Sequence, residues 1–293
     1  MLLLTGATGL IGSALVRRLT AARQPVRCLV RDPRRLGDER VRVQIALGDL
    51  ADPPSFRNAL RGVRTVVHLA ASIRDQPGGS IEELNGIATW RMVEAARRAG
   101  VEHFVFFSAQ GASSHSRARL LRAKAVAERA IAEAGVPHTI VAPSLAYAPG
   151  DRFITLLERL ALLPVVPVSG RGRARFEPIW AEDVASCVMT LLERPAPRNA
   201  ARYELSGPET LTHEEIVATA LRADGHPRRL VHVPTPVVRQ CLRLAETVMK
   251  SKAPATWDEA ELLEITMTSP RGTADAEALG VRPLRMAEVL AAV

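Results

Sequence analysis

The 293-residue sequence contains few cysteines, few aromatic residues and no long apolar run. Its three cysteines lie far apart, so their spacing favours neither a disulfide framework nor a zinc site. We therefore expect no metal site and a reducing compartment, the cytoplasm. No stretch approaches the roughly 20 uninterrupted apolar residues of a membrane-spanning helix. The apolar start, Met1–Leu4, carries no basic segment before it, so we do not expect a secretory signal.

Lysine is also scarce, although the chain is basic. The sequence has 39 Lys+Arg against 31 Asp+Glu, a net charge of +8, and only Lys124, Lys250 and Lys252 are lysines. A basic chain can bind nucleic acid, but these arginines are scattered and aromatic residues make up only 4%. We therefore do not expect nucleic acid as a partner. Arginine equally suits phosphate and other anionic ligands.

Short apolar runs alternate with amphipathic stretches of helical length through the first half of the chain. The runs are continuously apolar, which is typical of strands that are buried on both faces of a sheet. They predict strands at 1–4, 26–30, 41–47, 65–69, 104–107 and 138–142, with helices at 10–22, 53–61, 81–99 and 117–134. Such alternation predicts right-handed βαβ units and an α/β fold with a doubly wound parallel sheet.

The pattern changes after Pro143, where prolines become frequent and the apolar segments shorter. We therefore predict a nucleotide-binding domain over 1–143. A smaller C-terminal α/β lobe, for a substrate or a partner, is predicted over 144–176 and 194–293. Residues 177–193 are expected to pack back on the first domain.

A glycine-rich turn, Thr5-Gly6-Ala7-Thr8-Gly9-Leu10-Ile11-Gly12, joins the first predicted strand to the first predicted helix. Glycine lets the backbone turn tightly and approach a pyrophosphate, and the start of the helix offers free N–H groups. Its place at the head of a βαβ unit predicts a dinucleotide site. The alternative is a glycine turn that binds nothing.

The Gly-x-x-Gly-x-x-Gly spacing resembles that of the extended and atypical short-chain dehydrogenase/reductase superfamily, which has a Rossmann-type fold. Three later segments resemble the superfamily in the same order: Gly48-Asp49-Leu50, His68-Leu69-Ala70-Ala71 and Phe104–Ser108. The resemblance implies cofactor contacts at Gly6, Thr8, Gly9, Leu10, Ile11, Gly12, Asp49, Leu50, Leu69, Ala70, Ala71 and Pro143.

Arginines follow the second predicted strand, in Val30-Arg31-Asp32-Pro33-Arg34-Arg35. NAD-dependent relatives hold the adenosine ribose with an acidic residue here, because a carboxylate suits the unmodified diol. A guanidinium suits a 2′-phosphate instead. Arg31 and Arg34 therefore favour NADP(H) over NAD(H), while Asp32 keeps NAD(H) open. A solvated basic loop with no ligand is the remaining alternative.

The catalytic tyrosine of the superfamily is missing. Relatives pair a tyrosine with a lysine four residues later, on one helix face, and with an upstream serine; the tyrosine transfers a proton. Here Lys124 matches the lysine and Leu120 stands at the tyrosine position. Ser108 and Lys124 are thus the candidate catalytic residues, and the resemblance also assigns Lys124 to the cofactor ribose. Without this general acid the reaction rate falls by roughly 10²–10⁴-fold, so we expect little classical turnover.

Other side chains offer alternatives to the missing groups. Gln110 is a second residue that could reach a carbonyl, and His115 or Tyr147 could supply a proton. A loop histidine without a role is the simpler interpretation of His115, because no partner stands near it in sequence.

The segment from Ala142 to Phe153 resembles the proline-anchored substrate loop of the superfamily. The most similar version occurs in proteins related to the nucleotide-binding accessory subunit of respiratory complex I, which the resemblance describes as NADPH-binding and structural. Residues 236–252 carry apolar side chains at helical spacing with basic ones outside. Such a helix can bind a protein partner or the inner face of a membrane, or simply cover its own core.

Two functions therefore stay open. The first is an NADP(H)-binding protein of low turnover with a structural, assembly or redox-sensing role, which the leucine at position 120 favours. The second is an active NAD(P)H-dependent oxidoreductase or nucleotide-sugar epimerase-like enzyme that uses another proton donor. Its ligand would be a small-molecule carbonyl or a nucleotide sugar, and the retained Lys124 favours it.

Overall fold

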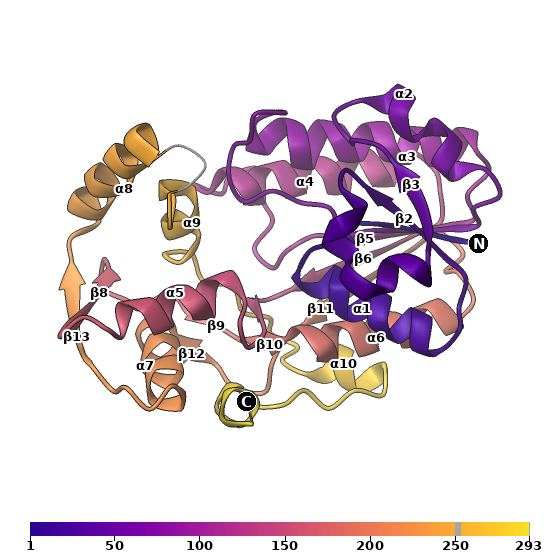
Figure 1. The fold of residues 1–293 in the computed structure, drawn as a ribbon. Coiled ribbons are helices and arrows are strands. Elements are labelled where there is room, and N and C mark those ends of the chain that lie inside the picture. Colours follow the sequence, from indigo (N-terminus) through magenta and orange to yellow (C-terminus); the bar gives the residue numbers. More distant parts are fainter. Residues whose placement is uncertain (250–252, 293) are drawn as a thin grey trace.

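A computed structural model describes residues 1–249 and 253–292, and its centre is a seven-stranded, all-parallel sheet (Figure 1). The strand order is β11-β6-β5-β4-β1-β2-β3. The strands are β1 (Leu2–Thr5), β2 (Val26–Val30), β3 (Gln44–Leu47), β4 (Thr65–His68), β5 (His103–Phe107), β6 (His138–Pro143) and β11 (Ala200–Leu205). β1 lies between β2 and β4, so the strand order reverses at its carboxyl end. The predicted α/β, doubly wound parallel sheet is confirmed.

Helices cover both faces of this sheet, as strands with two buried faces require. They are α1 (Leu10–Ala21), α2 (Pro53–Phe56), α3 (Ala88–Arg98), α4 (Arg119–Glu133) and α6 (Ala181–Glu193), with the short turns η1 (Pro33–Val41), η2 (Arg57–Leu60) and η3 (Glu83–Ile87). The helices predicted at 53–61 and 81–99 each consist of two consecutive pieces, α2 with η2 and η3 with α3. Successive strand residues point to opposite faces, so Phe104 packs toward α3 and α4 while Val105 packs toward α1 and α6.

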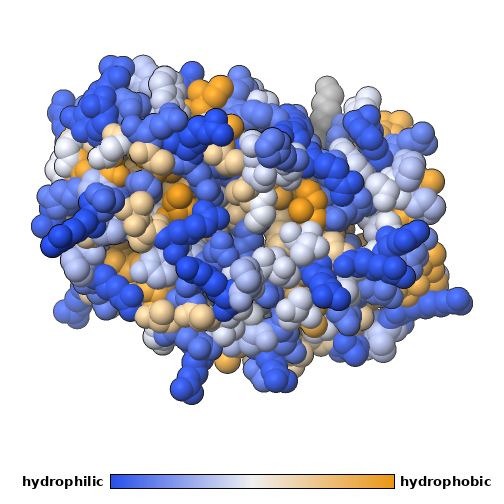
Figure 2. All heavy atoms as spheres, turned by 180° about the vertical axis from the view of Figure 1, so that it is seen from behind, coloured by the Kyte–Doolittle hydropathy of each residue, from blue (hydrophilic) through white to orange (hydrophobic). Residues whose placement is uncertain are grey.

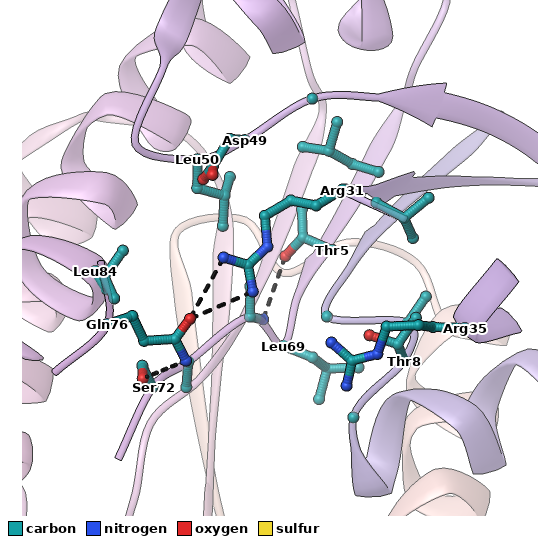
Figure 3. Close-up of a pocket in the computed structure, with 18 residues that line it drawn as sticks. Thr5, Thr8, Arg31, Arg35, Asp49, Leu50, Leu69, Ser72, Gln76 and Leu84 are labelled. Atoms are coloured by element: carbon teal, nitrogen blue, oxygen red, sulfur yellow. Dashed lines mark hydrogen bonds between the residues drawn. The ribbon is translucent and has the colours of Figure 1, made fainter. Parts of the chain in front are cut away.

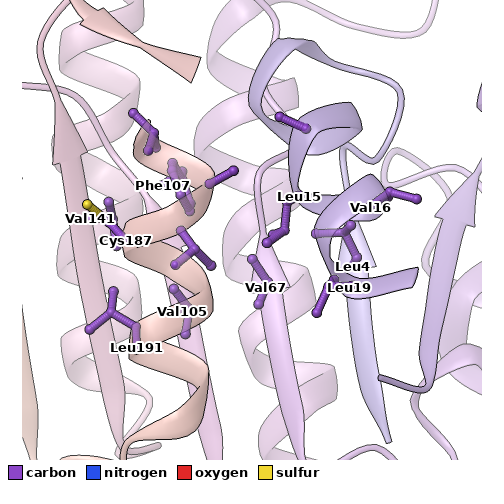
Figure 4. Close-up of a cluster of buried hydrophobic side chains, with 14 of the residues drawn as sticks. Leu4, Leu15, Val16, Leu19, Val67, Val105, Phe107, Val141, Cys187 and Leu191 are labelled. Carbon is purple, nitrogen blue, oxygen red and sulfur yellow. The ribbon is translucent and has the colours of Figure 1, made fainter. Parts of the chain in front are cut away.

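The core between the sheet and helices α1 and α6 is shown in Figure 4. The helices contribute Leu15 and Leu19 of α1 and Leu191 of α6 to this core, and the strands contribute Val67 and Val105. Burying one such side chain stabilises the fold by roughly 1.5–3 kcal/mol. This packing holds the start of α1 rigidly against the end of β1.

One part of the predicted smaller lobe belongs to the large sheet. Residues 194–293 are assigned to that lobe by the sequence pattern, but Ala200–Leu205 forms the edge strand β11, parallel to β6. The short helix α10 (Ala274–Ala278) also packs near it, where Asp275 Oδ2 accepts a hydrogen bond from the Glu204 backbone. The sequence pattern does not reveal this strand because an edge strand does not need a continuous apolar run, and this one contains Arg202 and Glu204. The division into two domains otherwise stays a prediction.

The remaining C-terminal region is a smaller α/β arrangement of three two-stranded pairs and several helices. The pairs are β7 (Ala146–Tyr147) with β10 (Ile179–Trp180), β9 (Arg175–Phe176) with β12 (Leu211–Thr212), and β8 (Val165–Ser169) with β13 (Arg229–Val233). The helices are α5 (Arg152–Leu160), α7 (His213–Ala223), α8 (Thr235–Met249), α9 (Trp257–Leu262) and α11 (Met286–Ala291). All of these elements except α8 contribute residues to a core that includes Tyr147 and Phe176.

Ion pairs tie α9 to the large sheet domain. Arg74, in the loop after β4, holds Glu259 of α9 through contacts of 2.6 Å, and both side chains are largely buried. Arg119 at the start of α4 pairs with Asp258 at 3.4 Å. The C-terminal region is therefore fastened across the start of α4.

The face seen in Figure 2 is dominated by hydrophilic side chains, with hydrophobic ones in small groups. Among the described residues, no helix has both the length and the apolar character needed to cross a membrane.

Candidate functional site

A cleft of ≈ 280 Å³ opens at the carboxyl ends of β1, β2, β3 and β4 (Figure 3). This is the point where the strand order reverses, and open α/β sheets bind ligands there. The loops after the four strands line it: Thr5, Gly6, Ala7, Thr8 and Gly9 after β1; Leu29, Val30, Arg31 and Arg35 at β2; Gly48, Asp49 and Leu50 after β3; Leu69, Ala70, Ala71, Ser72 and Gln76 after β4; and Leu84.

The glycines of the first turn are required by close backbone approach. Gly6 has φ +73°, and a Cβ on it would lie 2.6 Å from the Ala70 backbone nitrogen. A Cβ on Gly12 would lie 2.1 Å from the Gly6 carbonyl oxygen. Gly9 caps α1 without a side-chain hydrogen bond and lines the cleft. The start of α1 therefore presents its backbone N–H groups to the cleft, as a pyrophosphate requires.

Most of the expected cofactor residues line this cleft, but not all of them. Those that do are Gly6, Thr8, Gly9, Arg31, Asp49, Leu50, Leu69, Ala70 and Ala71. The lining does not include Leu10, Ile11, Gly12, Arg34, Lys124 or Pro143, nor the candidate Ser108. Gly12 lies behind the turn, where its lack of a side chain lets α1 pack against the backbone of Gly6 and Ala7. Sequence reasoning missed Arg35, Ser72, Gln76 and Leu84.

Two arginines face the cleft on the side of β2. Both Nη atoms of Arg31 lie 3.4 Å from Oε1 of Gln76, whose Nε2 donates to Ser72 Oγ at 3.1 Å (Figure 3). Arg35 reaches the cleft near Thr8. The guanidinium of Arg31 is held by a neutral partner through two long contacts, so its charge stays available to an anion.

Arg34 and Asp32 are paired with each other outside the cleft. Asp32 Oδ1 accepts hydrogen bonds from Nε and the backbone nitrogen of Arg34, at 3.1 and 3.0 Å. These bonds hold the pKa of the Asp32 carboxyl below its usual value. The Arg34 side chain is 85% exposed. Arg35, one residue on, therefore occupies the place in the cleft that the sequence pattern assigns to Arg34.

Lys124 belongs to α4, and its side chain reaches the carboxyl end of β5, the strand beside β4. Its Nζ donates to the Phe107 carbonyl at 2.6 Å and sits 4.8 Å from the centre of the Phe106 ring. The side chain is buried, and desolvation lowers its pKa to about 8, partly offset by Glu128. Ser108, which directly follows Phe107 at the end of β5, is also buried, and its Oγ has no hydrogen-bond partner among the described residues. These two groups fit a polar ligand that reaches the end of β5.

Leu120 occupies the position of the missing acid with an apolar contact. It is buried with Ile81 and Ala123, and Leu262 of α9 packs against the three. No hydrogen bond joins His115 or Tyr147 to Lys124 in the described residues. His115 is exposed on its loop, and burial raises the pKa of the Tyr147 hydroxyl, with further increases from the carboxylates Asp183, Glu209 and Glu288.

His68 is a structural residue of the site. Its Nδ1 lies 2.9 Å from Thr5 Oγ1 and its Nε2 lies 3.1 Å from Thr89 Oγ1. Complete burial lowers its pKa to about 3. The neutral ring therefore links the ends of β1 and β4, which carry two of the loops around the cleft, to α3.

Comparison with known proteins agrees with this geometry. The model of a family described as NAD(P)H-binding matches residues 6–195. An NAD(P)H azoreductase from Xenophilus azovorans is 31% identical over 249 residues, which cover 83% of this chain and 80% of that protein. The mitochondrial NADH dehydrogenase [ubiquinone] 1 alpha subcomplex subunit 9 of Arabidopsis thaliana is 28% identical over 249 residues, 80% of this chain and 60% of that subunit.

Solved structures share the fold over the whole chain. An NADPH-dependent quinone oxidoreductase from Escherichia coli, solved with NADPH, superposes with a TM-score of 0.78 at 16% identity, covering 100% of this chain and 99% of that one. At this identity the likeness shows the fold alone. The family match spans well over half of the chain, and the azoreductase is related along most of its length. The chain therefore belongs to the NAD(P)H-binding family of atypical short-chain dehydrogenases/reductases.

Proposed function

We propose that this protein binds NADPH in preference to NADH and holds it with little or no tyrosine-dependent carbonyl reduction, in a structural, assembly or redox-sensing role. The observation that carries the proposal is the packed leucine at position 120. An apolar side chain there cannot transfer a proton, and Leu262 of α9 packs against the cluster that contains it. General acid help contributes roughly 10²–10⁴-fold to such reactions.

The preference for NADPH rests on the side of the cleft at β2. Arg31 and Arg35 line it, whereas Asp32, the residue that could hold an unmodified ribose, is bonded to Arg34 outside it. A guanidinium binds a 2′-phosphate through charge-assisted hydrogen bonds, which are about twice as strong as neutral ones. Arg31 gives up only two contacts of 3.4 Å to make them.

The test is to purify the protein without added nucleotide, identify any bound nucleotide by mass, and follow absorbance at 340 nm with a panel of acceptors. The panel contains an aldehyde, a ketone, a quinone and an azo dye. We expect bound NADPH that none of these oxidises at an ordinary enzyme rate. Turnover at about 1 s⁻¹ or faster with any member overturns the low-turnover proposal. Bound NADH, or equal affinity for both nucleotides, overturns the preference.

A second candidate function, an NADPH-dependent reductase, is favoured by Lys124. NADPH, when bound, supplies a hydride. A buried ammonium with a pKa near 8 holds a proton at Nζ at neutral pH and can release it, and the relative named as an azoreductase is a reductase. Ser108 Oγ, which has no hydrogen-bond partner in the part of the chain that the structure describes, is available to orient the acceptor.

The reductase candidate makes a pH prediction that the holding role does not. The rate is expected to fall as the pH rises through about 8, because Lys124 then loses its proton. Lys124→Arg keeps the positive charge but cannot release a proton in this range. It is expected to keep NADPH binding and lose turnover. A variant with unchanged turnover and an unchanged pH profile rules out Lys124 as the donor.

A further inference from the structure

Helix α8 lies at the end of the C-terminal region that is far from the sheet (Figure 1), and its outer face is apolar. α8 has no buried residue along its 15 residues. Val237, Leu244 and Val248 are 47%, 67% and 73% exposed, and Cys241 is exposed as well. The strip next to these residues around the helix, at Val238, Leu242 and Ala245, is half-buried. The helix therefore carries a second apolar surface, the outer stripe, which the described chain does not cover.

The outer stripe is self-complementary. Its four residues, Val237, Cys241, Leu244 and Val248, are spaced by four, three and four positions, so the order is the same read in either direction. This is the a/d spacing of a helix that pairs with another helix. Under a twofold axis between positions 241 and 244, Val237 faces Val248 of a second copy and Cys241 faces Leu244. A twofold interface requires such a self-matching surface.

The flanks of the stripe indicate which partner fits. The positions beside it, where charged residues set partner choice in helix pairs, are Val238, Gln240, Ala245 and Thr247, and none is charged. Two copies of this +8 chain can therefore approach along the stripe without like charges meeting there. An anionic membrane would instead favour cations next to the apolar stripe. Arg239, the nearest candidate toward α9, stacks on Trp257, 5.2 Å from its ring.

More apolar surface is available on the same side of the lobe. Eight of the sixteen large apolar residues that are exposed in the described chain lie in 162–165 and 231–249. Strand β13 leads into α8 and pairs with β8, so Val165 and Val231 belong to the ribbon that carries the helix. A standard interface needs about 800 Å² from each partner, more than one helix stripe offers, and this ribbon can extend the contact.

We propose that α8 is a dimerisation helix, pairing antiparallel with α8 of a second copy through the outer stripe. The proposal does not depend on which nucleotide the protein binds. The sequence left a protein partner or a membrane open for residues 236–252, and the proposal assigns this segment to one partner, a second copy of the chain. Lys250 and Lys252 of that segment lie outside the described residues.

The first test is sedimentation velocity of the full chain from about 1 to 100 µM, with Leu244→Glu and Leu47→Glu as a matched pair. Both leucines are similarly exposed, 67% and 63%, but Leu47 lies on β3. We expect a wild-type dimer whose dissociation constant rises at least about tenfold with L244E, because unpaired carboxylates would be buried, and stays unchanged with L47E. A wild-type monomer throughout this range overturns the proposal.

The second test maps the contact. Cys28 and Cys187 are buried, so a short bismaleimide reacts with Cys241 in the native chain. We expect a cross-linked dimer that Cys241→Ser and L244E both abolish. Val126→Glu, at a residue of α4 that is 56% exposed, should leave the dimer intact. A dimer that survives L244E, or one that V126E or L47E disrupts equally, places the interface elsewhere and refutes the proposal. So does a monomer whose flotation with anionic vesicles depends on Leu244.

Discussion

Replacing Arg31 by alanine is expected to weaken NADPH binding and to leave NADH binding nearly unchanged. A hydrogen bond to a charged group contributes roughly 1.5–3 kcal/mol, and every 1.4 kcal/mol is a factor of ten in affinity. To bind the 2′-phosphate of NADPH, the Arg31 guanidinium gives up only two 3.4 Å contacts with Gln76, which are near the upper distance limit for a hydrogen bond. Losing these weak contacts therefore offsets little of the free energy gained from the new bond. The expected loss is therefore about 10–150-fold for NADPH. NADH has no 2′-phosphate and should change by less than about threefold.

Arg34→Ala is the matched control, because it removes the same charge three residues away. The Arg34 side chain is 85% exposed and bonded to Asp32, so its loss should weaken NADPH binding by less than about twofold. Arg35→Ala removes a guanidinium that does line the cleft and should give an intermediate loss.

Calorimetric titration of both nucleotides at two salt concentrations checks this order. The NADPH loss in R31A should shrink at high salt, since an exposed ionic contact is screened. Equal losses for NADPH and NADH would mean that Arg31 supports the cleft without contacting a 2′-phosphate. If R34A loses as much NADPH affinity as R31A, the loop must rearrange around the ligand. That result would refute the argument that Asp32 holds Arg34 outside the cleft and so leaves the cofactor preference to Arg31.

Three further changes test other parts of the structure. Gly12→Ala should lower the free energy of unfolding by about 1–3 kcal/mol, and the unfolding temperature with it, because its Cβ would lie 2.1 Å from the Gly6 oxygen. Gly9→Ala is the control, since its nearest contact is 3.3 Å, and it should fold normally. Equal unfolding temperatures for the two variants would contradict this prediction. His68 stays neutral in the fold down to pH about 3, so the unfolded chain binds the extra proton below pH 6.5 and stability falls as the pH falls. Between pH 7 and pH 4, urea unfolding should show the wild type losing roughly 3 kcal/mol more than His68→Gln; parallel curves would exclude the effect. Leu120→Tyr should destabilise the fold by about 1–3 kcal/mol without creating ketone reduction, and a gain of turnover at 340 nm would indicate a lapsed enzyme with an intact site.

The sheet and the phosphate turn could be predicted because their signals are local. Strands buried on both faces must be continuously apolar, and five of the seven strands of the sheet are recognisable this way; β3, at the opposite edge from β11, is largely exposed, but Ile45, Ala46 and Leu47 still mark it as a strand. β11 escaped because it lies at the edge, where Arg202 can pair with Glu128 at 2.9 Å and with Glu204. The glycine positions follow from backbone geometry, and the structure places Gly6 and Gly12 at contacts that no side chain could enter.

The side chains around the cleft were less predictable, because loops after different strands position them. Asp32 starts the turn η1 by bonding to Arg34, and this turn brings Arg35 rather than Arg34 into the cleft. The sequence pattern gives the three arginines but not the direction of that turn. Gln76 belongs to no motif and reaches Arg31 because the loop after β4 folds back across the carboxyl edge of the sheet.

Leucine at position 120 is part of a larger packing arrangement than the motif comparison implies. Leu262 packs against its cluster because α9 is fastened near the start of α4 by Arg74 with Glu259 and by Arg119 with Asp258. Breaking a largely buried pair such as Arg74–Glu259 by removing one partner is costly, since the other charge is left without compensation. A tyrosine at 120 would therefore meet a helix that is held in place. Recovering a proton donor at this position requires moving α9 as well as changing one residue, and for that reason the reductase candidate relies on Lys124.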